Sequence, residues 1–340
     1  MQERAAFGTI AMAAYNPDPE LFARQLRSIA AQTHTDFECL ISADGSPDRV
    51  AESVALAVPG DDRFTVIGFD DRCGFYGNFE RVVAASDPRA SWIALSDQDD
   101  YWYPNKLETL LPHLENHSLV SGQARVVEYP SGRVITPNTE RMDLSAAHFT
   151  LTNQFTGGIC VMRRDLIDIA LPFPRLATPS EVHDHWLAVC ASAASGTVVT
   201  QDVVQDYVQH GGNAIGEMLS ESSAVNPASS WATVRSIADR YEGGHGPAAV
   251  ARAVFKVSVG WRQLMVETLA RRVPPSADVE LLLELYGRKR GFAHTFAFIR
   301  DARKRGLVAG RSVVEYLGGW VAGWFVRGRS IAVPASTNAP

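Results

Sequence analysis

A short apolar run that ends in clustered carboxylates constrains this chain more than any other stretch. The run from Trp92 to Leu95 is continuously apolar, which is typical of a buried strand. Directly after it come Asp97, Asp99 and Asp100, three carboxylates within four residues. Neighbouring like charges disfavour ionisation unless water or a cation compensates them. Because carboxylate oxygens suit divalent cations, and open α/β sheets bind ligands at the carboxyl ends of strands, the stretch predicts a ligand or metal site.

The spacing of the acids gives this prediction a direction. Asp97 and Asp99 are two residues apart, so in an extended segment both side chains project to the same side. A metal held there would bridge the protein to a diphosphate and neutralise the charge of a leaving group. The alternative is a polar loop whose acids are solvated, and an Asp-x-Asp pattern taken alone does not decide between the two.

The N-terminal part of the chain alternates between apolar strands and amphipathic helices. Phe22, Leu26 and Ile29 recur at intervals of four and three residues, which places them on one face of a helix. Strands that alternate with helices predict a parallel sheet with right-handed crossovers. No Gly-x-Gly-x-x-Gly follows the first strand, which argues against a dinucleotide site. The expected elements are strands at 7–12, 37–43, 64–69 and 92–95, and helices from 19, at 50–57 and from 74.

After the acids the pattern is less regular. Residues 102–113 predict a helix with Pro104 near its start, and Lys106, one turn in, could approach a phosphate or be solvated. Residues 137–155 lack periodicity, and we interpret them as a mobile loop. The other expected elements are strands at 119–129, 134–135, 156–162, 197–200 and 203–210, and an apolar helix at 187–194 that is opened by residues 183–186.

Charge and composition separate the C-terminal third from the rest. Residues 288–329 hold ten Lys and Arg against two acids, so this segment carries +8, whereas the whole chain carries −6. A basic segment on an acidic protein indicates an anionic partner, but the net charge gives no sign of nucleic-acid binding. The last expected helix pairs aromatic with basic residues, as interfacial helices do; packing on the catalytic part or on a second subunit are the alternatives. These residues are Trp320, Trp324, Phe325, Arg327 and Arg329.

Cysteine usage and hydropathy bear on the compartment. Cys39, Cys160 and Cys190 lie in apolar runs and are expected as core residues, while Cys73 lies in a glycine-containing loop. Their spacing predicts neither a disulfide framework nor a zinc site. The first residues lack the apolar core of a signal peptide, and no stretch has the apolar length of a membrane span. We therefore expect a cytoplasmic protein, with the inner face of the plasma membrane as a docking place if the basic helices bind lipid.

Five motifs in a fixed order carry a family resemblance. They are Ala13-Ala14-Tyr15-Asn16, Ser42-Ala43-Asp44-Gly45-Ser46, Asp97-Gln98-Asp99-Asp100 with Trp102, His183-Asp184-His185-Trp186, and His210-Gly211-Gly212-Asn213. Each is weak alone, but together they resemble the family-2 glycosyltransferases with the GT-A fold, and most closely the bacterial rhamnosyltransferase-like branch. The resemblance covers residues 6–217 and leaves out the C-terminal third.

The resemblance implies a fold and a division of the chain. We expect an α/β GT-A (nucleotide-diphospho-sugar transferase) fold with a mainly parallel central sheet, followed by an α-helical extension. The expected parts are a catalytic domain at 1–217, a linker or lid at 218–230, a helical region at 231–334 and a frayed tail at 335–340. The expected helices of the extension start at 231 and then span 248–271, 277–286, 292–305 and 311–326.

By resemblance, one group of residues binds the nucleotide of the donor. Asp44 would accept the N3–H of uracil or thymine, although a carboxylate after a strand can equally cap the next helix. Asn78 could likewise cap a helix, and Arg81 could neutralise phosphate or be an ordinary surface charge. The nucleotide group comprises Ala13, Tyr15, Asn16, Asp44, Asn78, Asp97 and Gln98.

A second group would carry the chemistry. By resemblance Asp184 is the catalytic base; it would sit in the first turn of a helix, where a purely structural acid is the alternative. Asp99 and His210 would bind Mg²⁺ or Mn²⁺, with an ordinary loop histidine as the alternative for His210. The paired glycines suit close approach of a ligand or mark a bulge. The residues expected to border the sugar or acceptor are Trp102, Gly157, Gly158, His183, His185 and Trp186.

These residues together imply an inverting hexosyltransferase. The implied donor is a dTDP- or UDP-linked sugar, most specifically dTDP-L-rhamnose, and the acceptor a hydroxyl of a cell-envelope polysaccharide or glycolipid. Two other functions stay open. One is a metal-dependent phosphoryl transferase, and the other is a non-catalytic nucleotide-sugar-binding or scaffold protein. The oligomeric state also stays open.

Overall fold

The computed structural model describes residues 7–176, 178–211, 227–244, 246–324 and 326. The chain divides into two compact units. The sheet unit comprises Met1–Asp143, Gln154–Pro172 and His183–Ser220, and the helical unit comprises Leu144–Asn153, Phe173–Val182 and Glu221–Pro340. The helical unit therefore takes two segments from the range predicted as the catalytic domain. Most of the predicted linker, and the predicted tail, lie outside the described residues.

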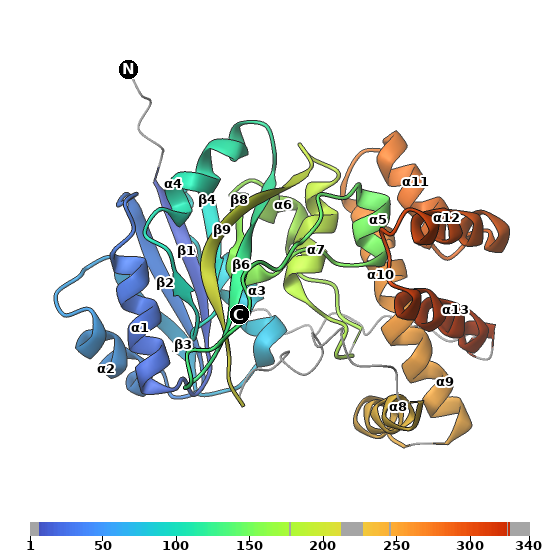
Figure 1. The fold of residues 1–340 in the computed structure, drawn as a ribbon, viewed down its shortest axis with the longest axis horizontal. Coiled ribbons are helices and arrows are strands. Elements are labelled where there is room, and N and C mark those ends of the chain that lie inside the picture. The colour runs from blue at the N-terminus through green and yellow to red at the C-terminus, as the bar shows by residue number, and fades with distance from the viewer. Residues whose placement is uncertain (1–6, 177, 212–226, 245, 325, 327–340) are drawn as a thin grey trace. The chain divides into compact units, whose positions relative to one another are not determined.

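The described strands of the sheet unit form one nine-stranded sheet in the order β3-β2-β1-β4-β8-β6-β9-β5, with β7 paired to β6 (Figure 1). Neighbours among β1 to β4 are parallel, as are β6 and β9, whereas β8 runs antiparallel to both β4 and β6. The strands are β1 (Gly8–Ala14), β2 (Phe37–Asp44), β3 (Phe64–Phe69), β4 (Trp92–Ser96), β5 (Tyr101–Trp102), β6 (Leu119–Glu128), β7 (Val134–Thr136), β8 (Cys160–Arg163) and β9 (Thr197–Gln209).

The direction of the chain decides which helices cover which face. From β1 the chain moves outward to β2 and β3 and then returns past β1 to β4. Right-handed crossovers therefore place α1 (Pro19–Ala30) and α2 (Pro47–Ala57) on one face and α3 (Gly74–Ala84) on the other. The reversal between β1 and β4 is a topological switch point, where open α/β sheets bind ligands.

The first helix shows how the sequence pattern becomes packing. Asp18 caps α1, because its Oδ1 accepts hydrogen bonds from the backbone N–H of Glu20 and Leu21 at 3.0 and 3.1 Å. Pro19 occupies the first helical position, as the sequence predicts. The predicted face of Phe22, Leu26 and Ile29 is buried against the sheet. Burial of such side chains contributes roughly 1.5–3 kcal/mol each.

The predicted helix at 102–113 is wrong at its start. Tyr101–Trp102 instead forms β5, because Tyr101 pairs with Asp206 and Trp102 with Gln205 on β9. The helix α4 (Lys106–Leu110) begins after Pro104 and continues as a 3-10 turn, Leu111–Glu115. A second 3-10 turn, Gly157–Ile159, precedes β8, and the two strands predicted at 197–210 are one strand. Strand pairing with a distant segment is not visible in local periodicity.

Two more helices complete the sheet unit. They are α6 (Leu166–Ala170) and α7 (His183–Ala191), which pack on each other. The first is too short to show helical periodicity and was not predicted. The second begins with the His-Asp-His-Trp motif, as predicted, and ends at Ala191, three residues before the predicted end at 194.

Part of the predicted mobile loop at 137–155 is a helix of the helical unit. α5 (Ala146–Leu151) buries Phe149 and Leu151. Arg262 donates hydrogen bonds to the carbonyl oxygen of Leu151, and the Tyr286 hydroxyl donates to that of Ala147. A helix of six residues shows too little periodicity to be recognised, and it is stabilised by contacts far along the chain.

The remaining helices of the helical unit follow the predicted pattern with one interruption. The predicted helix at 248–271 is divided by a π-helical turn, Lys256–Gly260. No helix among the described residues is long and apolar enough to cross a membrane. Three residues of the predicted interfacial helix, Phe325, Arg327 and Arg329, lie outside the residues that the structure describes. The helices are α8 (Pro227–Glu242), α9 (Pro247–Phe255), α10 (Trp261–Arg272), α11 (Ala277–Tyr286), α12 (Phe292–Lys304) and α13 (Gly310–Trp324).

Candidate functional site

The sequence motifs gather at one edge of the sheet. Ala14 at the end of β1 lies opposite Ala43 on β2, and Met12 lies opposite Ser96 on β4. The carboxyl ends of these three strands therefore meet, which brings the residues after each strand together. Because β8 runs antiparallel to β4, the 3-10 turn that precedes β8 reaches the same edge.

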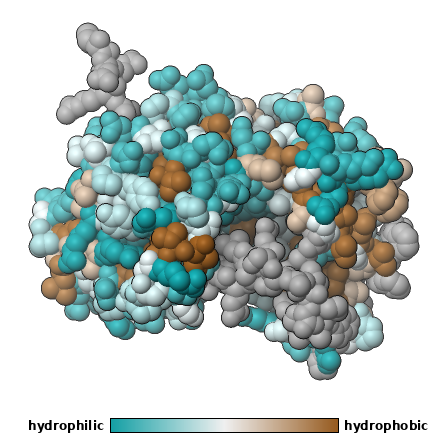
Figure 2. All heavy atoms as spheres, viewed as in Figure 1, coloured by the Kyte–Doolittle hydropathy of each residue, from teal (hydrophilic) through white to brown (hydrophobic). Residues whose placement is uncertain are grey.

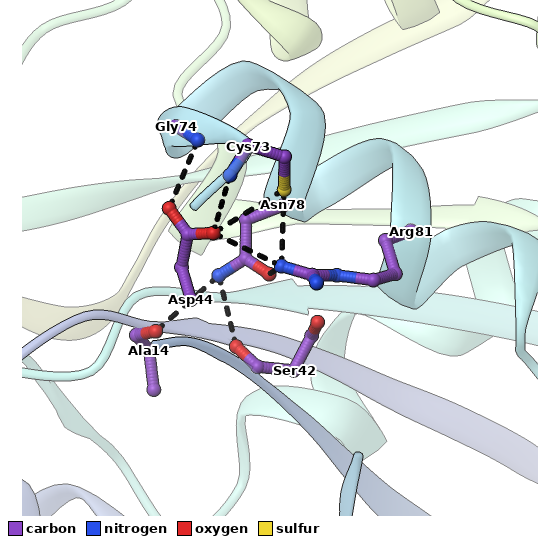
Figure 3. Close-up of polar contacts among 7 residues, drawn as sticks. All are labelled: Ala14, Ser42, Asp44, Cys73, Gly74, Asn78 and Arg81. Atoms are coloured by element: carbon purple, nitrogen blue, oxygen red, sulfur yellow. Dashed lines mark hydrogen bonds and ion pairs between the residues drawn. The ribbon is translucent and has the colours of Figure 1, made fainter. Parts of the chain in front are cut away.

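Asp44, the last residue of β2, is 1% exposed and lies within a set of hydrogen-bond donors (Figure 3). Its carboxylate accepts from the backbone N–H of Cys73 at 2.7 Å and of Gly74 at 2.9 Å, and from Nη2 of Arg81 at 3.1 Å. These N–H groups belong to the start of α3, so Asp44 caps that helix across space. The prediction that it could cap the next helix is wrong, because among the described residues no side chain caps α2.

Asn78 and Arg81 serve this same corner. Asn78 lies inside α3 and is not its cap; its Nδ2 donates to the carbonyl oxygens of Ser42 at 2.8 Å and Ala14 at 3.3 Å. The amide thereby ties β1 to β2 at their carboxyl ends, as Figure 3 shows. Arg81 donates to the Asn78 Oδ1 and forms an ion pair with Asp44. Arg81 is therefore not the solvated surface charge of the alternative prediction.

Gln98 connects the acidic motif to the turn after β1. Its Oε1 accepts from the Tyr15 N–H at 2.7 Å, and its Nε2 donates to the Tyr15 carbonyl at 3.1 Å. The Tyr15 ring is 47% exposed, and the Arg72 guanidinium lies 3.8 Å from its centroid. Asn16 has a positive φ of 39°, which fits the predicted turn, and Ala13 is half-buried. The exposed Tyr15 ring is a surface on which a nucleotide base could stack.

The three acids after β4 have different surroundings. Asp97 and Asp99 are half-buried, whereas Asp100 is 1% exposed and accepts from Gln205 Nε2 at 2.8 Å and the Val208 N–H at 3.0 Å. Burial, with the neighbouring charges of Asp99 and Asp184, raises the pKa of Asp97 to about 7. Burial also raises the pKa of Asp100 well above its usual range. The cluster thus resists full ionisation while it holds no cation.

Asp99 and His210 form the pair predicted to bind a metal. Nε2 of His210 lies 2.9 Å from Oδ2 of Asp99, and this hydrogen bond raises the pKa of the imidazole. Oδ2 of Asp99 and Nε2 of His210 are close enough to bind the same divalent cation, which would take the place of the proton between them. The described residues contain no group of three or more His, Cys, Asp or Glu that could hold a metal. Further ligands would therefore have to come from a substrate or water, as is common for Mg²⁺.

Gly157 and Gly158 allow a close approach between segments. A Cβ at Gly158 would lie 2.9 Å from Oδ2 of Asp97 and 3.1 Å from Oδ2 of Asp100. A Cβ at Gly157 would lie 2.2 Å from Nε2 of His183. The paired glycines therefore bring this turn against the acids on one side and against the start of α7 on the other.

The start of α7 carries the predicted base. Asp184 is 8% exposed; its Oδ2 accepts from the Gly157 N–H at 3.2 Å and its Oδ1 from the His185 N–H at 2.6 Å. His183 stacks on Phe79 with ring centroids 3.7 Å apart, and among the described residues neither ring nitrogen has a hydrogen-bond partner. Burial lowers the pKa of His183 to about 3, so the imidazole is neutral near pH 7.

The family assignment follows from comparison with known sequences. Residues 9–168, which include the Asp44 site, the three acids and both glycines, match the profile described as "Glycosyl transferase family 2". This matched stretch, just under half of the chain, is similar to glycosyl transferase family 2. With this match and the topology above, the predicted GT-A-like α/β fold with a C-terminal helical region is confirmed. Asp184 and His210 lie beyond the matched residues.

Individual relatives match this chain over shorter stretches. It is 31% identical over 128 residues to "dTDP-rhamnosyl transferase RfbG" of Shigella flexneri, which is 36% of this chain and 43% of that protein. It is 34% identical over 101 residues to "Succinoglycan biosynthesis protein ExoW" of Rhizobium meliloti, or 29% and 31% of the two chains. The chain thus spans less than half the length of these curated relatives.

A solved structure is similar over a longer stretch. The crystal structure of S. aureus TarS 1-349 in complex with UDP-GlcNAc matches with a TM-score of 0.49 and 14% identity. The match covers 81% of this chain and 83% of the other chain.

Two tryptophans of the family-2 motifs do not lie where the sequence places them. Trp102 and Trp186 were expected to border the sugar or acceptor, but both are 0% exposed. The Trp186 Nε1 donates to the Ala170 carbonyl at 2.9 Å, and the Trp102 ring belongs to the main hydrophobic cluster. His183 and His185 are each 3% exposed. These aromatic side chains therefore support the site from inside and present no ring to a ligand.

Lys106 is the largest surprise of the site. The sequence suggested a phosphate contact or a solvated side chain, but Lys106 is 0% exposed. Its Nζ donates to the Gly158 carbonyl and, at 2.7 Å, to Oε1 of Gln205. One signal was available, because Lys106 lies one helical turn from Leu110 and therefore on the apolar face of α4. Nothing in the sequence marked Gln205 as its partner.

Proposed function

We propose that this protein is an inverting glycosyltransferase that moves a sugar from a nucleoside-diphosphate donor to a hydroxyl group. The observation that carries the proposal is the gathering of Asp44, the acids after β4 and Asp184 at one edge of the sheet unit. The similarity of residues 9–168 to glycosyl transferase family 2 supports it. The alternatives of a phosphoryl transferase and of a non-catalytic module explain less, because neither needs a separate carboxylate such as Asp184 beside the acids.

The Asp44 corner supports a pyrimidine donor. Among the described residues, Oδ2 of Asp44 accepts one hydrogen bond, from Gly74, and a carboxylate oxygen has two lone pairs. The second lone pair can accept the N3–H of uracil or thymine, and the exposed ring of Tyr15 offers a stacking surface beside it. A dTDP-linked sugar, with L-rhamnose as the specific candidate, also agrees with the similarity to RfbG.

Asp99 and His210 would hold Mg²⁺ or Mn²⁺ in this reaction. Their contact at 2.9 Å and their oxygen and nitrogen donors suit such a cation. When bound, the cation neutralises charge on the departing diphosphate. Gln98 contributes indirectly, because its two hydrogen bonds to the Tyr15 backbone keep the acidic loop next to the nucleotide corner.

Asp184 would act as the catalytic base. The N–H groups of Gly157 and His185 fix its carboxylate and favour its ionised form. As the acceptor oxygen forms its bond to the anomeric carbon, the hydroxyl proton passes to Asp184 and the bond to the diphosphate oxygen breaks. Attack from the face opposite the leaving group inverts the anomeric configuration. A positioned base of this kind contributes about 10²–10⁴-fold to the rate.

The helical unit supports a membrane-associated acceptor, such as a glycolipid or a lipid-linked polysaccharide of the cell envelope. Phe292 and Phe296 are 53% and 38% exposed and stack on each other, while Trp320 packs edge-on against Phe292. Arg290 lies over the Trp320 ring. Figure 2 shows hydrophobic atoms over α13 next to hydrophilic atoms over α12. Aromatic side chains beside cations suit a surface of anionic lipid, at the inner face of the plasma membrane.

Vesicles test this partner directly. The protein should sediment with vesicles of phosphatidylglycerol and not with vesicles of phosphatidylcholine. The double variant Phe292→Ser with Phe296→Ser should bind them several-fold more weakly. Unchanged binding by this variant would remove the aromatic cluster from the proposal.

A thermal-shift panel tests the proposed donor. Melting temperature is measured with dTDP, UDP and GDP, each with and without Mn²⁺, because a ligand that binds only the folded state stabilises it by mass action. Stabilisation by dTDP or UDP that grows with Mn²⁺, and little effect of GDP, is the expected result. Transfer from dTDP-rhamnose or a UDP-sugar is then followed by release of the nucleoside diphosphate. A flat response to all three nucleotides would favour a scaffold, and phosphate release without sugar transfer would favour a phosphoryl transferase.

A further inference from the structure

The buried ammonium of Lys106 has no role in the mechanism above. Its side chain lies at the start of α4 without exposed surface. A buried ammonium is unfavourable unless hydrogen bonds and charges compensate it. Here two N–H groups donate to Gly158 and Gln205, and Nζ lies 3.5 Å from the centroid of the Trp102 ring. Two hydrogen bonds and one cation–π contact thus occupy the whole ammonium group.

The partners of Lys106 are neutral. Among the described residues no carboxylate lies within ion-pair distance of Nζ. The nearest link to an acid runs through Gln205, whose Nε2 donates to Asp100. Burial lowers the pKa of Lys106 well below its usual value, although the charges of Asp100 and Asp97 oppose this shift. Lys106 therefore reaches the acids through Gln205 and does not itself occupy their oxygens.

The hydrogen bonds of Lys106 belong to a chain that crosses the site. On one side Asp100 joins Gln205 and the backbone of Val208 on β9. On the other side Lys106 holds the carbonyl of Gly158, and the N–H of the adjacent Gly157 donates to Asp184. The dipeptide Gly157-Gly158 thus accepts a hydrogen bond from Lys106 through its Gly158 carbonyl and donates one to Asp184 through its Gly157 N–H.

The absence of side chains at this dipeptide makes the chain of contacts possible. A Cβ at either glycine would overlap an acid or His183, so the turn is pressed between the acids and α7. A peptide held so closely transmits the position of its neighbours, because packed segments have little room to adjust. Without the ammonium, the Gly158 carbonyl would be buried and lack this donor.

We propose that Lys106 is a positioning residue that fixes the Asp184 carboxylate relative to the donor-binding acids through Gly158 and Gly157. This inference rests on the proposed function, since it concerns the base of that reaction. This positioning role differs from a role in donor binding. Among the described residues, Asp44, Asp99 and His210 form no hydrogen bond or ion pair with Lys106. A small displacement of a base is enough to lower a rate strongly.

A double-mutant cycle between Lys106 and Asp184 tests the proposal. Lys106→Met shortens the side chain by one heavy atom and removes its N–H donors. In the wild-type background it should lower kcat at least tenfold and change KM for the donor less than threefold. In the Asp184→Asn background the same substitution should lower kcat less than threefold, because no base remains to be positioned. Gln201→Met, at an exposed position of β9, is the matched control and should leave both constants unchanged.

Three results would overturn the proposal. The first is an equal fall of kcat in both backgrounds, which would indicate a general structural role. The second is a rise in KM without a fall of kcat, and the third is an unchanged kcat. If Lys106→Met does not fold by circular dichroism, Gln205→Met replaces it, since it removes one acceptor of Lys106. It should lower kcat three- to tenfold when Asp184 is present and less than twofold when it is not; equal effects in both backgrounds overturn the proposal as well.

The same experiment separates this inference from the proposed function. The wild-type protein and Asp184→Asn are first compared in nucleotide-dependent melting and in sugar transfer. If the wild type neither binds a pyrimidine nucleotide nor transfers sugar, the proposed function fails before Lys106 is considered. If both occur and the cycle shows equal effects, only the inference about Lys106 fails.

Discussion

The two carboxylate corners of the sheet unit are built in opposite ways. At the nucleotide corner a single acid, Asp44, receives two backbone N–H groups and the Arg81 guanidinium. At the acidic corner Asp97, Asp99, Asp100 and Asp184 lie together, and burial raises the pKa of Asp97 to about 7. At the nucleotide corner, these hydrogen-bond donors of the protein compensate the charge of Asp44. The acidic corner is linked to the buried Lys106 through Gln205, and its clustered carboxylates make it suited to a cation and to moving a proton.

The largest expected effect removes the base from the acidic corner. Asp184→Asn keeps the size of the side chain and removes its ability to take a proton. We expect sugar transfer to fall about 10²–10⁴-fold, while pyrimidine nucleotide still raises the melting temperature. Asp168→Asn, an exposed acid of α6, is the matched control and should retain full activity. A fall of less than about tenfold would contradict the assignment of Asp184 as base.

The next largest effect comes from adding a methyl group where Gly158 packs against the acids. Gly158→Ala places a Cβ 2.9 Å from Oδ2 of Asp97 and 3.1 Å from Oδ2 of Asp100, so these carboxylates or the turn that carries the glycine must shift. We expect activity to fall about 10- to 100-fold, and the free energy of unfolding to fall by about 1–3 kcal/mol. Initial rates and urea unfolding measure the two effects. Gly318→Ala, on α13 where a Cβ meets no atom within 4 Å, should leave activity unchanged and should not lower the free energy of unfolding, because alanine favours a helix more than glycine does.

The compensated corner should respond mainly in binding and in stability. Asp44→Asn removes the charge that pairs with Arg81 and sets an amide against backbone N–H groups. We expect the affinity for UDP or dTDP to fall about tenfold and the free energy of unfolding to fall by about 1–3 kcal/mol. Titration calorimetry and melting of the ligand-free protein measure these changes. Asp48→Asn, at an exposed position of α2, is the control, and an unchanged affinity in Asp44→Asn would exclude base recognition by this residue.

The smallest expected effect on activity concerns the neutral His183 between α3 and the glycines. Because its pKa is about 3 in the folded protein and about 6.5 when unfolded, the unfolded state binds more protons below pH 6.5. Stability is therefore lost as the pH falls from about 6.5 towards 3, by about 2–3 kcal/mol between pH 6.5 and 4.5.

Substitution separates this contribution from the rest of acid unfolding. His183→Gln cannot take up a proton, so its free energy of unfolding should fall less steeply between pH 6.5 and 4.5. Urea unfolding at several pH values gives the slope. His294→Gln, at an exposed position in the helical unit, should keep the slope of the wild type. Identical slopes for all three proteins would show that His183 is accessible to protons in the folded state.

Local patterns predicted most of the elements correctly. Helical periodicity placed α1 and α11, and short apolar runs placed β1 to β4, because burial on one face or on both faces leaves a period in the sequence. The family motifs also predicted which residues meet at the edge of the sheet. These signals fail for α5, which has six residues, and for β5, which exists because Tyr101 and Trp102 pair with β9.

Roles within the site were less predictable than positions. Trp102 and Trp186 belong to the motifs, yet both rings are buried. Asn78 was a candidate helix cap and instead joins two strands, and Asp44 caps a helix thirty residues further along the chain. In each case the side chain has several possible partners, and only the fold selects one.

The sequence by itself determined the parallel strands β1 to β4, the polar motifs that follow them, and the similarity of residues 9–168 to glycosyl transferase family 2. These follow from periodicity and from residue types at fixed spacing. The tertiary structure alone decided how charge is compensated at each corner. Lys106 lies 52 residues from Gly158 and 99 from Gln205 in the chain, and no local pattern links them. Electrostatic and hydrogen-bond partners depend on distance in space, and this distance is set only when the whole sheet has formed.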